Sequence, residues 1–232
     1  MRKRLCIVIA AALCLAAAVA WAGERPRVVM LGDSLTAGCD WQARLPEAEV
    51  LNLGVSGDST WSIAARLDDV VTAQPEIIFL QAGINDMGKK PNPEGIVSRH
   101  LKIWQTLRER LPEAELHIVS LLPVSAKRYP RWGQPVARTN DLLRAAAKER
   151  GLRYIDVYSS LSDAAGSLSK ELSYDGLHLR PKAYDPWVAA LKPAISRAAE
   201  QAAAGESFVV MPIKAETGAA HAAGTIAPRA VQ

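Results

Sequence analysis

Short apolar runs rich in β-branched residues alternate with longer helical stretches from residue 26 onward, and this alternation limits the possible folds more than any other feature. The spacing predicts strands at 27–31, 49–54, 76–83, 115–122 and 153–157, and helices at about 36–45, 59–73, 93–111, 135–150 and 182–203. Strands that alternate with helices form parallel sheets with right-handed crossovers. We therefore expect an α/β fold, a flavodoxin-like doubly wound three-layer α/β/α sandwich around a central five-stranded parallel sheet.

The first 22 residues have the three parts of a secretory signal peptide. Residues 2–4 are basic (Arg-Lys-Arg), residues 5–20 are apolar, and residues 20–22 (Ala-Trp-Ala) fit a small-x-small cleavage site. We expect cleavage after Ala22 and a periplasmic or secreted protein. An uncleaved anchor is the alternative, although the apolar run is shorter than the ~20 residues that a spanning helix needs.

The length of the chain is sufficient for one domain. A sequence of 232 residues, with 49% hydrophobic and 22% charged residues, is typical of a globular protein with a single core. We assign residues 23–200 to the domain. From residue 201 the sequence becomes rich in Ala and Gly, which predicts a flexible tail to residue 232. Within it, Ser-Phe-Val-Val-Met-Pro-Ile at 207–213 could instead add an edge strand or bind a partner.

Charge argues against nucleic acid or an anionic membrane as a partner. Removing the three bases of residues 2–4 from 28 Lys and Arg leaves 25, against 24 Asp and Glu, which is a net charge of +1. A chain with so small a net charge lacks the excess of positive charge that is typical of a polyanion-binding protein. We also expect no stable membrane insertion after signal cleavage.

Cys39 is the one cysteine outside the signal, and we interpret it as a small buried hydrophobic residue rather than a reactive thiol.

Polar clusters follow four of the expected structural units. They are Gly-Asp-Ser-Leu (32–35) after the first strand, Asn-Leu-Gly-Val-Ser-Gly-Asp-Ser (52–59) after the second, Gly-Ile-Asn-Asp (83–86) after the third and Tyr-Asp-Gly-Leu-His (174–178) beyond the fifth. In a doubly wound sheet, functional groups gather outside the carboxyl ends of the strands. We expect the four clusters to meet at this edge.

Ser34 and His178 are the candidate nucleophile and base. A serine hydroxyl attacks an ester at neutral pH only when a neighbouring base accepts its proton. Among the histidines, His178 alone lies in a glycine-containing loop with a carboxylate three residues earlier. That spacing lets Asp175 hold the imidazole in the tautomer that accepts a proton from Ser34. Taken alone, the residues around Ser34 are equally compatible with an ordinary turn.

Attack on a carbonyl also requires hydrogen-bond donors for the oxyanion. We expect three: the Ser34 N–H where a helix begins, the Gly54 N–H, which no side chain obstructs, and the side-chain amide of Asn85. Each has a structural alternative, since Gly54 can be a turn glycine and Asn85 can form an Asx-turn.

Together the four clusters resemble the four sequence blocks of the SGNH, or GDSL, family of serine hydrolases. The resemblance spans roughly residues 26–195 and implies an ester-hydrolysing enzyme with the flavodoxin-like SGNH hydrolase fold. By position it implies Ser34 as nucleophile, His178 as base, Asp175 as acid, and Ser34, Gly54 and Asn85 as the oxyanion hole. We expect Asp33 and Asp86, which also belong to the motifs, to brace the loops.

The resemblance implies a two-step acyl transfer that needs no cofactor and no metal. The expected substrate is a small-molecule or glycan ester with a short, acetyl-type acyl group, because the chain has no obvious long apolar lid. The alternatives are a lysophospholipase or acyl thioesterase on longer acyl chains, a carbohydrate O-acetyltransferase using the same triad, and a non-catalytic binding protein.

One loop is a candidate for substrate binding. Residues 123–138, between the fourth strand and the fourth long helix, are expected to overhang the site. Trp132, Arg131 and Arg128 could hold a sugar face or an anionic group there. The structural alternative is a solvated loop with one packed tryptophan.

Overall fold

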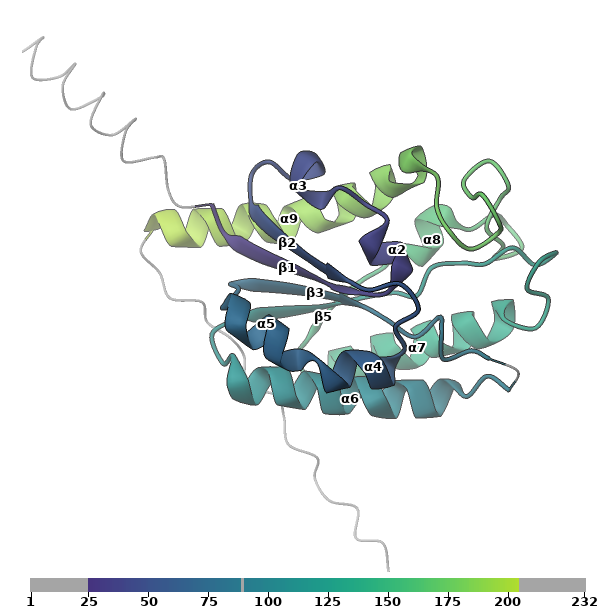
Figure 1. Cartoon of the computed structure of the whole chain (residues 1–232), viewed down its shortest axis with the longest axis horizontal. Helices are drawn as coiled ribbons and strands as arrows, with labels where there is room; N and C mark the ends of the chain where they lie inside the picture. Colours follow the sequence, from purple (N-terminus) through teal and green to yellow (C-terminus); the bar gives the residue numbers. More distant parts are fainter. Residues whose placement is uncertain (1–24, 89, 205–232) are drawn as a thin grey trace, which may run out of the picture.

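The computed structural model describes residues 25–88 and 90–204 (Figure 1). The predicted signal peptide at 1–22 lies outside the described residues, as does the run at 207–213. Residues 201–204, which we expected to belong to the tail, form the end of the last helix. Within the described ranges, no helix is both long and apolar enough to cross a membrane.

Five parallel strands form the sheet in the order β2-β1-β3-β4-β5. They are β1 (Arg27–Gly32), β2 (Glu49–Gly54), β3 (Ile77–Gln81), β4 (Glu115–Val119) and β5 (Arg153–Ile155). All five predicted strands are confirmed, and the last three end earlier than expected. The inner strands β1 and β3 are buried almost throughout, which explains their continuous apolar sequences. The edge strand β2 is partly exposed.

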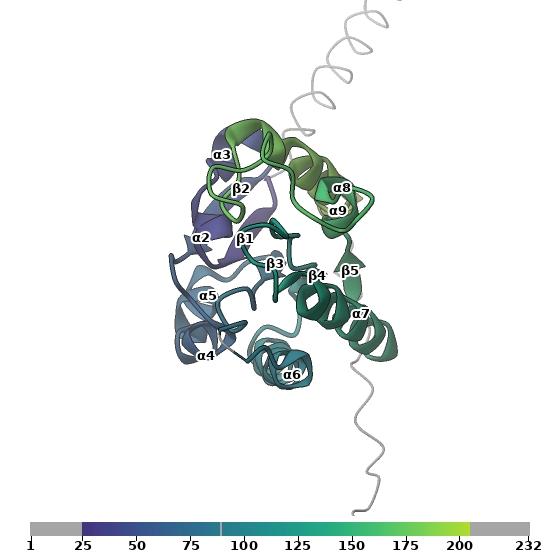
Figure 2. The same cartoon turned by 90° about the vertical axis from the view of Figure 1, so that its right-hand side faces the viewer.

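Helices cover both faces of the sheet, as the predicted three-layer sandwich requires (Figures 1 and 2). One face carries α2 (Ser34–Ala37), α3 (Trp41–Arg44), α8 (Tyr158–Leu161) and α9 (Asp185–Ala204), with the 3₁₀ turn η1 (Pro181–Tyr184) leading into α9. The other face carries α4 (Thr60–Ala65), α5 (Leu67–Ala73), α6 (Pro93–Arg110) and α7 (Gly133–Glu149).

Two predicted helices are each divided in the structure. The helix expected at 36–45 is α2 and α3, because α2 ends at Gly38 and Asp40 then caps α3 by accepting from the Ala43 N–H at 3.1 Å. The helix expected at 59–73 begins with the Ser59 cap, as predicted, but breaks at Arg66. There φ is −124° and ψ is 27°, outside the helical range.

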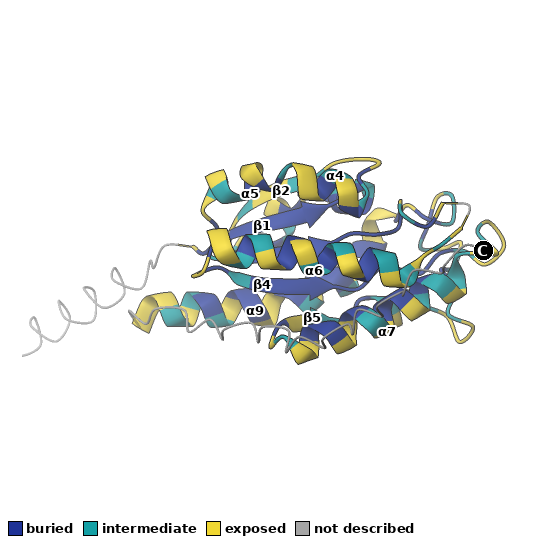
Figure 3. Cartoon of the chain, turned by 90° about the horizontal axis from the view of Figure 1, so that it is seen from below, coloured by how far each residue is buried: buried dark blue, intermediate teal, exposed yellow. Residues whose placement is uncertain are grey.

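The hydrophobic core lies between the sheet and each helix layer. In Figure 3, β1 and β4 are buried along most of their length, whereas α6 and α7 alternate buried and exposed residues. Large aromatic side chains fill the α3–α9 side: Trp41 and Trp187 are fully buried, with ring centroids 5.0 Å apart in an edge-on arrangement. This packing holds the strand ends, and hence the polar clusters that follow them, in fixed positions.

Candidate active site

Ser34 lies at the point where β1 gives way to α2. Asp33 is the N-cap of α2, and its side chain accepts from the Leu35 N–H at 2.9 Å, which makes Ser34 the first helical residue. Gly32 is required here for space. A Cβ at this position would lie 2.1 Å from Thr36 Oγ1 and 2.6 Å from the Gln81 carbonyl oxygen. The absence of a side chain at Gly32 therefore lets α2 start directly above the strand end.

The three residues of the predicted triad form a continuous chain of contacts. Ser34 Oγ lies 3.0 Å from His178 Nε2, and His178 Nδ1 lies 2.7 Å from Asp175 Oδ2. The other carboxylate oxygen, Asp175 Oδ1, accepts from the N–H groups of Leu177 and His178 at 3.0 and 2.8 Å. Gly176, with φ +88°, allows this tight turn. A proton on Nδ1 facing Asp175 leaves Nε2 free to accept the Ser34 proton.

The electrostatics of Asp175 suit this arrangement. Burial opposes its ionisation, but hydrogen bonds from the His178 ring and from the His178 and Leu177 N–H groups outweigh it and lower the pKa of Asp175 to about 2. The carboxylate is therefore ionised at any pH near neutrality and can stabilise a positive charge on the His178 ring.

The Ser34 N–H and the Asn85 amide, two of the three predicted oxyanion donors, each have an N–H group with no acceptor among the described residues. The Ser34 N–H donates to no acceptor within 25–88 and 90–204. Asn85, in the exposed turn after β3, donates from Nδ2 to the Asp58 carbonyl oxygen at 2.9 Å. An amide nitrogen carries two N–H groups, so this bond fixes the side chain and leaves the second N–H for another acceptor.

Gly54 does not offer its N–H in the way we expected. That group donates to the Asn52 side-chain oxygen at 2.9 Å. A Cβ at Gly54 would lie 2.3 Å from the Ala37 nitrogen, so the glycine serves the close contact of β2 with α2. The prediction of a turn or donor glycine at this position is replaced by a packing role.

Gly57 was not among the predicted donors, but it has the unobstructed N–H that we expected of Gly54. It is exposed, its φ is +85°, and a Cβ there would meet nothing within 4 Å. The Asp58 N–H donates to the Val55 carbonyl oxygen at 3.1 Å, so residues 55–58 form a type II turn with glycine at its third position. Among the described residues the Gly57 N–H has no acceptor. The sequence Val-Ser-Gly-Asp carries this turn signal.

Residues 30–185 match the sequence profile of the GDSL-like lipase/acylhydrolase family. The chain belongs to this family. The matched region contains all four polar clusters and extends from β1 to the first residue of α9, so it includes most of the described domain. The protein is a carboxylic ester hydrolase of the SGNH/GDSL type.

Individual relatives agree with this placement. The platelet-activating factor acetylhydrolase IB subunit alpha1 of Bos taurus is 30% identical over 181 residues, covering 75% of this chain and 77% of its own. A GDSL-like lipase of Bacteroides thetaiotaomicron superposes with a TM-score of 0.65 at 22% identity, over 78% of this chain and 96% of its own. An acetylxylan esterase of Geobacillus stearothermophilus gives 0.62 at 16% identity, over 75% and 95%. The two solved structures share the fold of this GDSL hydrolase.

Residues 133–138 of the predicted loop belong to α7, and the preceding residues, 123–132, pack against the turn that carries Asp175 and His178 in this hydrolase. The Ser125 N–H donates to the Gly176 carbonyl oxygen at 2.8 Å, and Arg128 Cγ lies 3.0 Å from where a Cβ of Gly176 would be. Arg128 and Arg131 are exposed, and neither side chain makes an ion pair or a hydrogen bond within the described residues. Arg128 is thus brought beside the triad turn.

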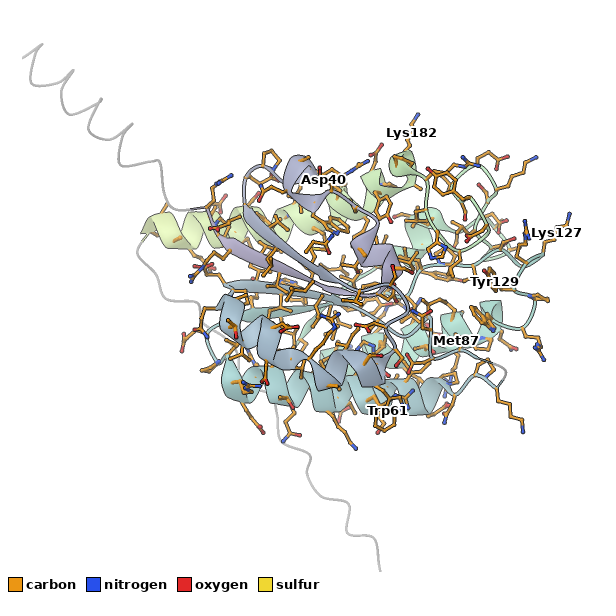
Figure 4. All side chains as sticks on the ribbon, viewed as in Figure 1. Asp40, Trp61, Met87, Lys127, Tyr129 and Lys182 are labelled. Carbon is orange, nitrogen blue, oxygen red and sulfur yellow. The ribbon has the colours of Figure 1, made fainter. Side chains whose placement is uncertain are left out.

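Trp132, by contrast, is engaged within the loop. Its ring stacks on Tyr129 with centroids 4.7 Å apart, and its Nε1 donates to the Gly88 carbonyl oxygen at 3.1 Å. One face of the Trp132 ring is therefore covered, as in the packed-tryptophan alternative. Figure 4 places Tyr129 and Lys127 at the end of the molecule toward which β1 and β2 point.

The two motif aspartates make the bracing contacts that we expected of them. Asp86 accepts from the N–H and Oγ1 of Thr60 at 2.8 and 2.6 Å and from Arg99 at 2.8 Å, which ties the turn after β3 to α4 and α6. Asp33 caps α2.

Cys39 is buried, as predicted, and burial raises the pKa of its thiol to about 11. Within the described part of the chain, no cluster of His, Cys, Asp or Glu has the makings of a metal site.

Asp33 is fully buried, and its Oδ2 has no hydrogen-bond partner among the described residues. Burial raises the pKa of Asp33 to about 7; the Leu35 N–H and His178 oppose the rise, and Asp58 and Asp86 add to it. The folded protein therefore binds this proton more tightly than the unfolded chain, whose pKa is 3.8. The contribution of protonated Asp33 to the free energy of unfolding is therefore fully present below about pH 4, and it is lost as the pH rises toward 7.

Replacing Asp33 with asparagine should remove this pH dependence while keeping an acceptor for the Leu35 N–H. We expect the free energy of unfolding of Asp33→Asn, relative to wild type, to rise by about 2–4 kcal/mol between pH 5 and pH 8, since one pKa unit corresponds to about 1.4 kcal/mol. Urea denaturation of both proteins at the two pH values measures it. A difference between the proteins that is the same at pH 5 and pH 8 would contradict the buried titration.

Proposed function

We propose that the protein hydrolyses short-chain carboxylic esters through an acyl-enzyme formed on Ser34. The observation that carries the proposal is the unbroken path from Ser34 Oγ through the His178 ring to Asp175, with heavy-atom distances of 3.0 and 2.7 Å. Distances of this size allow direct proton transfer from the hydroxyl to the imidazole. Ser34 is also partly exposed, so an ester can reach it.

The proposed reaction has two steps. Ser34 Oγ attacks the ester carbonyl carbon as its proton passes to His178 Nε2; the C–O bond to the alcohol then breaks, and His178 returns the proton to the departing alkoxide. Water repeats the sequence on the acyl-enzyme, with His178 accepting its proton, and releases the carboxylic acid. Asp175 keeps the proton on His178 Nδ1 and stabilises the transient imidazolium.

The proposed oxyanion hole consists of the Ser34 N–H, the Gly57 N–H and the free N–H of Asn85. The Val55 N–H donates to the Gly32 carbonyl oxygen at 3.1 Å, which attaches the 55–58 turn directly to the strand end below Ser34. Asn85 is bonded to Asp58 of the same turn. Three donors fixed in this way stabilise the charge that develops on the carbonyl oxygen, the type of interaction worth about 3 to 4 kcal/mol per donor.

The short acyl group is supported by the relatives and by the loop beside the triad. Two of the similar proteins are named as an acetylhydrolase and an acetylxylan esterase. The loop places the exposed, charged side chains of Lys127, Arg128 and Arg131 near the triad turn instead of an apolar surface. We propose that Arg128 and Arg131 contact a polar or anionic alcohol part of the substrate.

A series of aryl esters of increasing acyl length tests the substrate class. We expect kcat/KM to be highest at two to four carbons and to fall at least about tenfold by eight, because an acyl chain gains about 0.8 kcal/mol per methylene only where apolar surface buries it. Arg128→Gln should leave this profile unchanged while slowing acetyl esters of anionic alcohols more than neutral ones. A maximum beyond eight carbons would instead indicate a lysophospholipase or thioesterase. An equal effect of Arg128→Gln on both alcohols would contradict its binding role.

A further inference from the structure

Arg66 connects three segments that meet below the proposed oxyanion hole. It lies at the break between α4 and α5, two helices that Figure 1 shows below the sheet. Its Nε donates to Asp58 Oδ2 at 2.6 Å, and its Nη2 donates to the carbonyl oxygens of Leu53 at 2.8 Å and Gly32 at 3.1 Å. The side chains are largely buried, with 18% of Arg66 and 10% of Asp58 exposed.

Each acceptor of Arg66 belongs to a segment that carries a proposed oxyanion donor. Gly32 ends β1 two residues before Ser34, and Leu53 lies at the end of β2 before the 55–58 turn. Asp58 follows Gly57 directly, and its carbonyl oxygen accepts from Asn85 Nδ2. One guanidinium is therefore linked to the Ser34 segment, to the Gly57 turn and, through Asp58, to Asn85.

The chemistry of arginine explains why this residue is suited to the position. A guanidinium is planar and directs several N–H groups along fixed directions, so it can hold a carboxylate and two carbonyl oxygens in one rigid arrangement. The ammonium group of lysine could pair with Asp58, but it is a compact point charge on a flexible chain. The break of the helix at Arg66 places the start of this side chain beside all three acceptors.

We propose that Arg66 is a positioning residue that sets the distance between the Ser34 N–H, the Gly57 N–H and the Asn85 amide. The inference rests on the proposed function, because it assigns Arg66 to the oxyanion hole of that reaction. A residue of this kind acts on the transition state, where the oxygen carries charge, and has little influence on binding of the neutral ester. Misplacement of such donors by about 1 Å can cost on the order of 100-fold in rate.

The test compares Arg66→Lys with wild type on p-nitrophenyl acetate and with methylboronic acid, which forms a tetrahedral adduct on a nucleophilic serine. We expect kcat to fall about 10- to 100-fold with KM within about twofold, and the affinity for methylboronic acid to fall by a similar factor. Asp58→Asn, which keeps the backbone acceptor of Asn85 but loses the ion pair, should show the same pattern and decides the question if Arg66→Lys does not fold.

Arg27→Lys is the matched control. Arg27 is the first residue of β1, at the opposite end of the strand from Gly32, and its guanidinium pairs with both carboxylate oxygens of Glu76 at 3.3 Å. This variant should keep both kcat and boronate affinity. Wild-type kcat in a folded Arg66→Lys, or a rise in KM alone, would overturn the inference. If Ser34→Ala retains wild-type activity, the proposed function fails, and the positioning role fails with it.

Discussion

Replacing Ser34 with alanine is expected to lower kcat for p-nitrophenyl acetate by on the order of 10⁶. Loss of the nucleophile in a serine hydrolase has an effect of this size because no acyl-enzyme can form, and the small activity that remains comes from the oxyanion donors and substrate binding. Among the residues that the structure describes, Ser34 Oγ makes one hydrogen bond, to His178 Nε2, so its removal should leave the fold intact. The measurement is the initial rate of ester cleavage, with circular dichroism to establish folding.

Ser160→Ala is the control for this prediction, since Ser160 is an exposed serine on α8 that is remote in sequence from the four polar clusters. It should retain full activity. An aryl phosphonate should label wild type and Ser160→Ala once, and should leave Ser34→Ala unlabelled. If Ser34→Ala keeps more than about a tenth of the wild-type rate, the acyl-enzyme mechanism is wrong.

Replacing Asp175 with asparagine is expected to lower kcat by about 10³- to 10⁴-fold, because it reverses the tautomer of His178. Asp175 Oδ1 accepts two backbone N–H groups, so the oxygen of an asparagine must take that position. Its amide nitrogen then faces His178 Nδ1 and donates to it. The ring proton is driven to Nε2, which can no longer accept a proton from Ser34.

The chain offers a close structural control for Asp175. Asp163 Oδ1 also accepts from two backbone N–H groups, those of Ala165 and Ser167, each at 2.9 Å, beside a glycine with φ +74°. Asp163→Asn therefore makes the same change in a similar turn that holds no histidine. It should leave kcat within about twofold of wild type. Equal losses in the two variants would mean that Asp175 acts through turn stability instead of through His178.

The pH behaviour of the wild-type enzyme follows from the same residue. The pKa of Asp175 is about 2 in the folded protein and 3.8 as the reference value, so its ionised form favours the native state above about pH 4. This contribution is lost as the pH falls through 2. Titration of Asp175 should therefore not limit activity between pH 5 and pH 8.

Local sequence patterns were sufficient to predict the five strands and the contact between Asp175 and His178 of the triad. Apolar β-branched runs predict strands correctly because a parallel sheet covered on both faces accepts little else, and all five were placed. The Asp-x-x-His spacing predicts the contact of Asp175 with His178 because both lie in one turn. Such short-range relations depend on few residues, so they can be predicted without knowledge of the rest of the fold.

The glycines were harder to distinguish. Gly54 and Gly57 lie three residues apart, the first at the end of β2 and the second in the turn that follows it. Their roles depend on what surrounds them: the backbone of α2 lies against Gly54, whereas Gly57 meets open space. Trp132 is a similar case, because its Nε1 donates to Gly88, which lies 44 residues away in the sequence.

By itself, the sequence determined the order of strands and helices along the chain and the chemical groups that follow the strands, because these follow from local hydrophobic periodicity and turn chemistry. Only the tertiary structure decided which of the groups face one another. Ser34 and His178 are 144 positions apart, and their 3.0 Å contact exists because the packed core brings the end of β1 beside the turn before η1.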